Sequence, residues 1–192
     1  MCNAYNTAKD PKKISVSAFD GLATRLIRRT DQAPVVLSGG EVASMRWGFE
    51  RRGLGVVNNT RSDNLESRMW KDSYEKRRCL VPLLSYYEWS GPKGNKRTHL
   101  FKSPTPSWLF AAGLWEESRE WGPCFSMLTT EANSLVSPYH HRMPAILTES
   151  EQKLYLEFHL EGFAPDSSLL IVEDSVNPLL KNPPTHIQEE LF

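Results

Sequence analysis

The sequence predicts an α+β fold, a single mixed domain with a curved or barrel-like, mostly antiparallel sheet and flanking helices. Three observations predict this fold. Short strand-like runs recur between glycine- or proline-containing turns, few segments have a helical pattern, and no shift in composition divides the 192 residues. We therefore expect one domain over residues 1–192, with a tail from about residue 183 that is loosely packed.

The first half of the chain is expected to hold two helices and two strands. A short helix is expected over residues 18–29, and strands over 34–38 and 43–49 are joined by a turn at Gly39-Gly40. A glycine-containing loop follows at 51–55. Ser62 has the character of a helix cap, which predicts a helix over 62–71.

The second half is expected to be richer in strands. Strands over 78–84 and 86–90 come before a hairpin turn at 91–95, which is rich in glycine and proline. The remaining elements expected are strands over 98–102, 108–115 and 124–129 and helices over 131–136 and 148–158.

Composition excludes several classes of protein. No apolar run is long enough to span a membrane, and the N-terminus lacks the pattern of a secretory signal, so we expect a cytoplasmic protein, nucleoid-associated if bacterial and nuclear if eukaryotic. The three cysteines, Cys2, Cys79 and Cys124, have no CxxC spacing, which argues against a disulfide scaffold or a zinc site. We expect no metal and no cofactor, and we expect Cys79 and Cys124 to be buried core thiols.

Charge does not by itself indicate a nucleic-acid partner. The chain has 23 basic and 23 acidic residues and a formal net charge of zero. The basic residues are nevertheless gathered in short clusters, at residues 25–29, 51–52, 76–78 and 93–97. A basic face on a neutral protein is one interpretation of this pattern, and ordinary solvated surface is the other.

Cys2 is the most informative residue. Removal of Met1 would leave Cys2 as the N-terminus, with an α-amine and a thiol on adjacent carbons. Their ordinary pKa values, about 7.7–8.0 and about 8.5, leave each group partly deprotonated near neutral pH. With an aldehyde, the amine forms a Schiff base and the thiol closes on it to give a five-membered thiazolidine. The alternative is that Cys2 is an ordinary residue behind the start methionine.

Three further motifs contain residue types that carry chemistry. They are Asn59-Thr60-Arg61-Ser62, Tyr86-Tyr87-Glu88-Trp89 and His140-His141-Arg142-Met143-Pro144. Each has a structural alternative when taken alone. Asn59 has the character of a turn or cap residue, Glu88 that of an exposed strand carboxylate, and a lone histidine such as His140 is more often structural than catalytic.

Together, and in this order, these motifs resemble the SOS-response-associated peptidase (SRAP) family, whose best-known members are abasic-site cross-linking proteins. The family has a cysteine after the initiator methionine, an Asn-Ala-Arg-like motif, an aromatic-Glu-Trp motif and a His-x-Arg-Met-Pro motif. Two further segments, Trp47-Gly48-Phe49 and Val176-Asn177-Pro178, resemble other family elements. The resemblance runs from residue 2 to about residue 182 and implies an SRAP-like fold.

The resemblance also implies a role for each residue. Cys2 would be the nucleophile and the point of attachment, and Asn59 would hold its α-amine or nearby backbone. Glu88, flanked by aromatic residues, would have a raised pKa and relay protons. His140 would protonate the ring oxygen of the closed sugar and so expose its aldehyde. The phosphate contacts would come from the guanidinium groups of Arg61, Arg68 and Arg142.

The sequence departs from the family pattern at positions expected near DNA. Asn3-Ala4 stands where the family usually has Gly-Arg, and the usual Tyr-Asn-x-x-Pro stretch is not recognisable. Arg51-Arg52 stands where a further tryptophan is often found, and His141 where aspartate is common. These changes leave the catalytic set intact and alter the expected DNA contacts.

The sequence therefore predicts a monomeric enzyme that captures abasic sites in single-stranded DNA through Cys2 as a covalent cross-link. Two alternatives remain open. One is a cysteine peptidase, with Cys2 as nucleophile and His140 as base, whose proteolysis includes processing of its own N-terminus. The other is a non-catalytic reader of single-stranded DNA, which would bind in a salt-sensitive way without needing Cys2.

Overall fold

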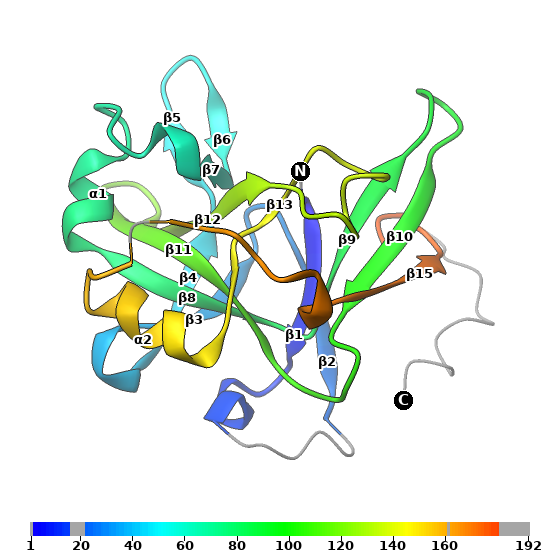
Figure 1. Ribbon diagram of the computed structural model, residues 1–192. Coiled ribbons are helices and arrows are strands. Elements are labelled where there is room, and N and C mark those ends of the chain that lie inside the picture. Colours follow the sequence, from blue (N-terminus) through cyan, green and yellow to red (C-terminus); the bar gives the residue numbers. More distant parts are fainter. Residues whose placement is uncertain (1, 16–21, 161, 181–192) are drawn as a thin grey trace.

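Five strands close into a barrel at the centre of the molecule. The computed structural model describes residues 2–15, 22–160 and 162–180. The barrel strands are β3 (Gln32–Val36), β4 (Val42–Trp47), β8 (Arg78–Leu83), β11 (Leu109–Ser118) and β12 (Gly122–Glu131). They pair in the order β12-β4-β3-β8-β11, and β11 pairs with β12 to close the ring (Figure 1). Only the β12–β4 contact among these is parallel, so the predicted barrel-like, mostly antiparallel fold is confirmed.

A second, fully antiparallel sheet packs beside the barrel. Its order is β15-β10-β9-β1-β2, and its strands are β1 (Ala4–Ala8), β2 (Thr24–Arg28), β9 (Ser85–Ser90), β10 (Arg97–Lys102) and β15 (Ile171–Ser175). Strand β1 runs antiparallel to β9, with Tyr5 opposite Tyr86. Continuing that register towards the N-terminus brings residue 2 level with the end of the Tyr87-Glu88-Trp89 motif.

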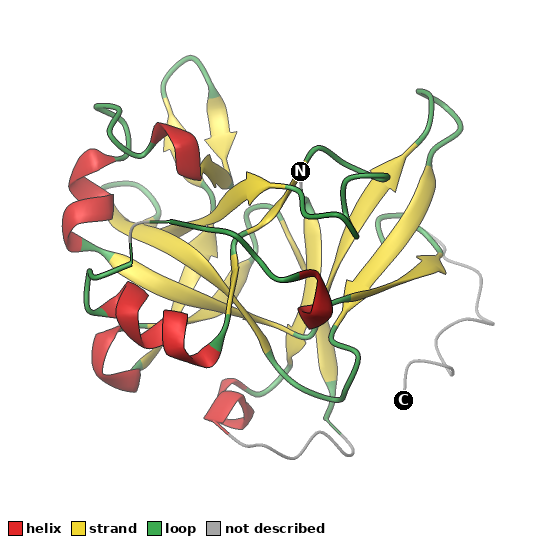
Figure 2. Cartoon of the chain, in the orientation of Figure 1, coloured by secondary structure: helices red, strands yellow, loops and turns green. Residues whose placement is uncertain are grey.

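Short elements complete the two sheets. Strands β5 (Phe49–Arg51) and β6 (Gly55–Val57) form a separate hairpin, β7 (Asn59–Arg61) and β13 (Arg142–Pro144) pair with β12, and β14 (Ile146–Leu147) pairs with β11. The helices are α1 (Lys71–Lys76) and α2 (Glu149–Leu156), and the 3-10 turns are η1 (Pro11–Ser15), η2 (Ser38–Gly40), η3 (Ser62–Asn64) and η4 (Ser167–Leu169). Both α-helices cover the side of the barrel that faces away from the second sheet (Figure 2).

The main hydrophobic core joins the barrel to the second sheet. It combines barrel residues such as Trp47 and Phe125 with Tyr86 and Phe101 of the second sheet, and it includes Cys2. A second cluster lies under the helices, where Tyr155 of α2 donates a hydrogen bond of 2.9 Å to the carbonyl of Gly113. Within the described ranges, no helix is long and apolar enough to cross a membrane.

Helix α2 begins where the sequence predicts, because its N-terminus is fully capped. The Thr148 side chain accepts a hydrogen bond from the backbone N–H of Glu151, and the Glu151 carboxylate accepts one from the backbone N–H of Thr148. This capping box satisfies two amide groups that the first turn would otherwise leave without partners. The predicted strands around residues 78–84, 86–90 and 98–102 are also present.

Three predicted helices are wrong. Of the helix expected over 18–29, residues 16–21 lie outside the described residues, and Thr24–Arg28 is strand β2, paired along its length with β1. The segment 62–71 is a 3-10 turn and irregular turns, and α1 begins only at Lys71. Of the helix expected over 131–136, Glu131 ends β12 and the turns begin at residue 134. The Asn133 side chain accepts hydrogen bonds there from the backbone N–H groups of Leu135 and Val136. Local side-chain bonds of this kind compete with helix formation.

Candidate functional site

Cys2 lies fully buried where the second sheet meets the barrel. Its solvent exposure is 0%, and its thiol donates a hydrogen bond of 3.3 Å to the carbonyl of Ala4. Burial raises the pKa of the Cys2 thiol far above its ordinary value, and the negative charge of Glu88 raises it further. The thiol is therefore held protonated, within electrostatic reach of the Glu88 carboxylate.

Two neighbouring amides hold the Cys2 backbone. The Nδ2 atom of Asn59 donates to the Cys2 carbonyl at 2.7 Å, and that of Asn58 reaches the same oxygen at 3.4 Å. Asn58 is fixed in turn through its backbone carbonyl. This oxygen accepts hydrogen bonds from the indole N–H of Trp47 at 2.8 Å and from the backbone N–H of Met127 at 3.1 Å. The Trp47-Gly48 segment thus positions the amides that hold Cys2.

Gly48 lets the chain turn tightly beside these amides. Its φ is +130°, and a Cβ there would lie 2.4 Å from Cγ1 of Val56 and 3.6 Å from Cβ of Asn58. Valine is stiff at χ1, so the Val56 side chain does not turn away easily. Glycine is therefore required both by the backbone conformation and by the close approach of the β5–β6 hairpin.

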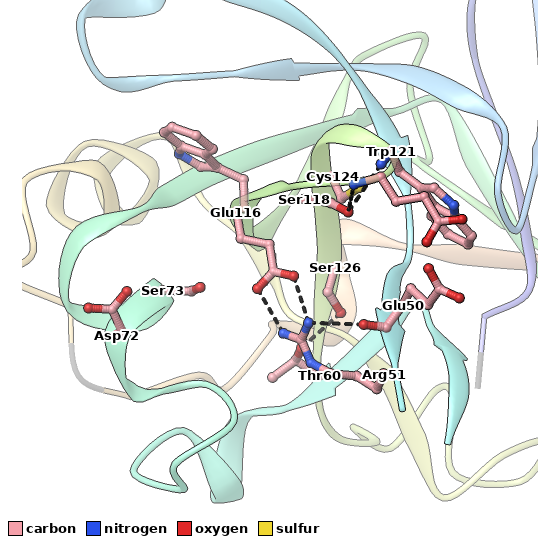
Figure 3. A network of polar contacts seen from close by, with 12 residues as sticks. Glu50, Arg51, Thr60, Asp72, Ser73, Glu116, Ser118, Trp121, Cys124 and Ser126 are labelled. Atoms are coloured by element: carbon pink, nitrogen blue, oxygen red, sulfur yellow. Dashed lines mark hydrogen bonds and ion pairs between the residues drawn. The ribbon is translucent and has the colours of Figure 1, made fainter. Parts of the chain in front are cut away.

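A polar network fastens the strands that lead to Asn59 (Figure 3). The Arg51 guanidinium binds both oxygens of the Glu116 carboxylate, at 2.6 and 2.8 Å, and lies 4.8 Å over the ring of Phe49. Thr60, the residue after Asn59, donates a hydrogen bond of 2.8 Å to Ser126 on β12. Arg51 thus joins the β5–β6 hairpin to the barrel, which leaves its guanidinium committed to a carboxylate.

Glu88 is a buried carboxylic acid on β9. Its exposure is 1%, and burial raises its pKa from 4.5 to about 7. A group with such a pKa both donates and accepts protons near neutral pH, as general acid–base chemistry requires. The aromatic neighbours of Glu88 in the sequence predicted a raised pKa, and its buried position agrees. The alternative, an exposed strand carboxylate, is wrong.

His140 lies on the loop between β12 and β13. Its Nδ1 lies 3.0 Å from the backbone nitrogen of Arg142 and accepts a hydrogen bond from this N–H when the ring carries its proton on Nε2. The same Nδ1 lies 2.9 Å from the Arg142 carbonyl, which accepts a hydrogen bond from it when Nδ1 is protonated. Burial lowers the pKa of His140, so the neutral ring is favoured at pH 7.

Tyr139 anchors this loop beside the Glu88 strand. The Tyr139 ring lies 4.4 Å from the ring of His99 and 5.6 Å from that of Phe101, both on β10. In the β9–β10 register, His99 is directly opposite Glu88. The residue before His140 therefore packs on the direct neighbour of Glu88, and this brings the histidine and the acid to the same end of the second sheet.

The three arginines predicted to contact phosphate have different surroundings. Arg61 is exposed and forms an ion pair with Asp63, whose pKa its guanidinium lowers to about 2. Arg142 is buried, donates to the Thr129 carbonyl and has its Nη1 3.5 Å from Asp63. Arg68 is exposed. The structure therefore gives Arg142 a packing role in its present position, whereas Arg61 and Arg68 stay accessible.

The other two cysteines are separate from this site. Cys79 and Cys124 are both free and buried, and burial raises the pKa of Cys124 to about 11. Among the described residues, no group of three or more histidine, cysteine or acidic side chains could hold a metal ion.

The structure adds contacts that the sequence motifs did not reveal. Asn58 contributes a second amide to the Cys2 carbonyl, and the Trp47 indole holds Asn58. Only two features of the sequence hint at these contacts. They are the adjacent asparagines Asn58-Asn59 and the pair Trp47-Gly48. Tyr139 and His99 could not have been placed, because their contact depends on how the loop folds over the second sheet.

The fold and the site together define a class of protein: an antiparallel barrel with a buried cysteine next to the N-terminus, held by asparagine and close to a buried acid. The family described as "SOS response associated peptidase (SRAP)" matches residues 1–175. The chain belongs to this family.

Two curated relatives come from Bacillus subtilis (strain 168). The chain is 29% identical to "Abasic site processing protein YoqW" over 131 residues, which cover 62% of this chain and 58% of YoqW. It is 28% identical to "Abasic site processing protein YoaM" over 152 residues, which cover 72% of this chain and 66% of YoaM. The matched part is thus less than two thirds of the length of these relatives.

Solved structures share the fold. A protein from Bordetella bronchiseptica has a TM-score of 0.75 at 20% identity, with 91% of this chain and 99% of that chain covered. A protein from Bacteroides thetaiotaomicron has a TM-score of 0.71 at 20% identity, with 90% and 91% covered. At this identity the likeness shows the fold alone.

The raised pKa of Glu88 predicts a pH-dependent effect of Glu88→Gln on stability. The folded protein binds this proton more tightly than the unfolded chain, so ionisation destabilises the fold as the pH rises from 4.5 through about 7. Glutamine resembles the neutral acid and removes this loss. The free energy of unfolding of the variant relative to wild type should therefore rise by about 3 kcal/mol between pH 4.5 and pH 8, measured by urea denaturation.

The matched change Glu120→Gln, at an exposed position, reports the effect of removing one negative charge from the surface. If the difference between Glu88→Gln and wild type were the same at both pH values, the raised pKa of Glu88 would be contradicted.

Proposed function

We propose that this protein captures abasic sites in single-stranded DNA by forming a covalent bond between Cys2 and the aldehyde of the abasic sugar. The observation that carries the proposal is the hydrogen bond from Asn59 to the Cys2 carbonyl, which fixes residue 2 in a buried site beside Glu88. Membership of the SRAP family and the printed names of the curated relatives support the same substrate.

The reaction begins at the sugar. The abasic nucleotide is mostly a closed hemiacetal, and opening it breaks the bond between C1′ and the ring oxygen. His140 gives that oxygen a proton from its imidazolium form, in which Nδ1–H donates a hydrogen bond to the Arg142 carbonyl and Nε2–H is transferred. The ring is left neutral, which is the form that its lowered pKa favours. The C1′ hydroxyl then gives its proton to water as the C1′ carbonyl forms, and the aldehyde is exposed.

Capture then uses both groups of Cys2. After removal of Met1, the α-amine attacks C1′, and one water leaves as the imine forms. The Cys2 sulfur adds to the same carbon, and its proton ends on the ring nitrogen by way of Glu88. The product is a thiazolidine, and the overall change is one aldehyde, one amine and one thiol giving one ring and one water.

The protonated Cys2 thiol fits capture better than a peptidase reaction. A peptidase cysteine attacks as a thiolate and is activated by a lowered pKa, whereas burial and Glu88 raise the pKa of Cys2. In capture the amine attacks first. The thiol then closes a ring on the same residue, a step that proximity favours strongly, so that Glu88 needs only to accept its proton as the ring closes.

The direct test is intact-mass analysis of the protein mixed with single-stranded DNA that carries one abasic site. We expect an adduct with the mass of the demethionylated protein plus the oligonucleotide minus one water, formed with wild type and with Cys124→Ala but not with Cys2→Ala. Cys124→Ala is the matched control because it also removes a buried thiol. An adduct that persists in Cys2→Ala would refute the proposed mechanism.

A second test separates ring opening from capture. His140→Ala should slow adduct formation with abasic DNA by about 100-fold, as expected for loss of a general acid. It should leave the rate with a simple open-chain aldehyde, such as glyoxylate, within about twofold of wild type. Equal slowing with both aldehydes would contradict the assignment of His140 to ring opening.

A further inference from the structure

The turn between β9 and β10 carries a dense group of positive charges. Lys93, Lys96 and Arg97, here called the basic hairpin, lie in a stretch from Ser90 to Thr98 that has no acidic residue. All three side chains are exposed. None of the ion pairs formed among the described residues involves them, whereas Arg51, Arg61 and Arg142 each pair with a carboxylate. The basic hairpin is therefore a local excess of charge on a protein of zero net charge.

The register of the sheet places this charge next to the candidate site. Ser90 pairs with Arg97, and Glu88 lies two residues before Ser90 on the same strand. The turn is held tight at Gly91, which has a φ of +91° and where a Cβ would lie 3.0 Å from the Asn95 carbonyl. In Figure 1 the hairpin projects beyond the rest of the second sheet, on the side of the molecule where the chain begins.

Electrostatic effects on the site agree with this placement. The positive charge of Lys96 contributes to lowering the pKa of His140 and opposes the rise in the pKa of Glu88. One exposed ammonium group therefore acts on both residues. A ligand phosphate bound at Lys96 would lie close to the same two side chains.

We propose that the basic hairpin binds phosphates of the DNA strand that flank the abasic nucleotide held at Cys2. Ammonium and guanidinium groups are the usual protein partners of backbone phosphates. This chain has no basic residue at positions 3 and 4 and uses Arg51 and Arg142 in its own packing. The basic hairpin therefore supplies, on the Glu88 strand and its partner, accessible charge that these positions do not. The inference rests on the proposed function and assigns the surface along which the strand runs.

The test measures binding without capture. The probe is a single-stranded oligonucleotide with a tetrahydrofuran residue in place of the abasic sugar, which cannot open to an aldehyde. Affinity is measured by fluorescence anisotropy over a range of salt concentrations with the full-length chain, the triple variant Lys93→Gln/Lys96→Gln/Arg97→Gln and a control. The control, Lys9→Gln/Lys12→Gln/Lys13→Gln, makes the same change in net charge at and beside η1. That segment lies at the opposite end of the molecule in Figure 1.

Each phosphate contact on a single strand contributes about 0.7 to the slope of log affinity against log salt. The hairpin variant should therefore lose about 2 from the magnitude of this slope and bind at least tenfold more weakly at low salt, and the control should match wild type. Equal slopes for the hairpin variant and the control would overturn the inference, as would failure of wild type to bind the probe at low salt. If wild type also formed no adduct with true abasic DNA, the proposed function itself would fail.

Discussion

The hydrogen bond of 2.7 Å from Asn59 to the Cys2 carbonyl is the contact on which the rest of the site depends. Cys2 leads into β1 of the second sheet, whereas Asn59 belongs to β7, which pairs with the barrel strand β12. The bond therefore ties residue 2, and with it the second sheet, to the barrel. Trp47 supports this bond through Asn58, and Gly48 leaves the space that the β5–β6 hairpin needs. Because Cys2 also belongs to the main core, it is held in place by the packing that stabilises the fold.

Burial determines the protonation of the site. It raises the pKa values of Cys2 and Glu88 and lowers that of His140, so each group favours its neutral form. In the proposed reaction, the lowered pKa makes protonated His140 a stronger acid towards the sugar oxygen, and capture then proceeds through an uncharged amine. The charges proposed to contact DNA lie outside this buried group, on exposed side chains such as Lys96 and Arg68.

The sequence predicted the strands better than the helices, and the reason is physical. Strands β8 (78–83) and β11 (109–118) contain apolar runs, which mark them locally. Thr24–Arg28 is a strand because it pairs with β1, a contact that its own residues do not encode. For the site, the order of motifs pointed to Cys2, Asn59, Glu88 and His140. The burial of Arg142 and the contact between Tyr139 and His99 arise from tertiary packing, which motif spacing does not reveal.

The attachment point of the captured sugar tests the central claim most directly. The adduct with abasic DNA is digested with trypsin and nuclease, and the modified peptide is sequenced by tandem mass spectrometry. The account predicts a peptide that begins at Cys2, without Met1, and carries the sugar remnant on residue 2 through both nitrogen and sulfur. A remnant on a lysine, on Cys79 or Cys124, or on a chain that retains Met1 would contradict it.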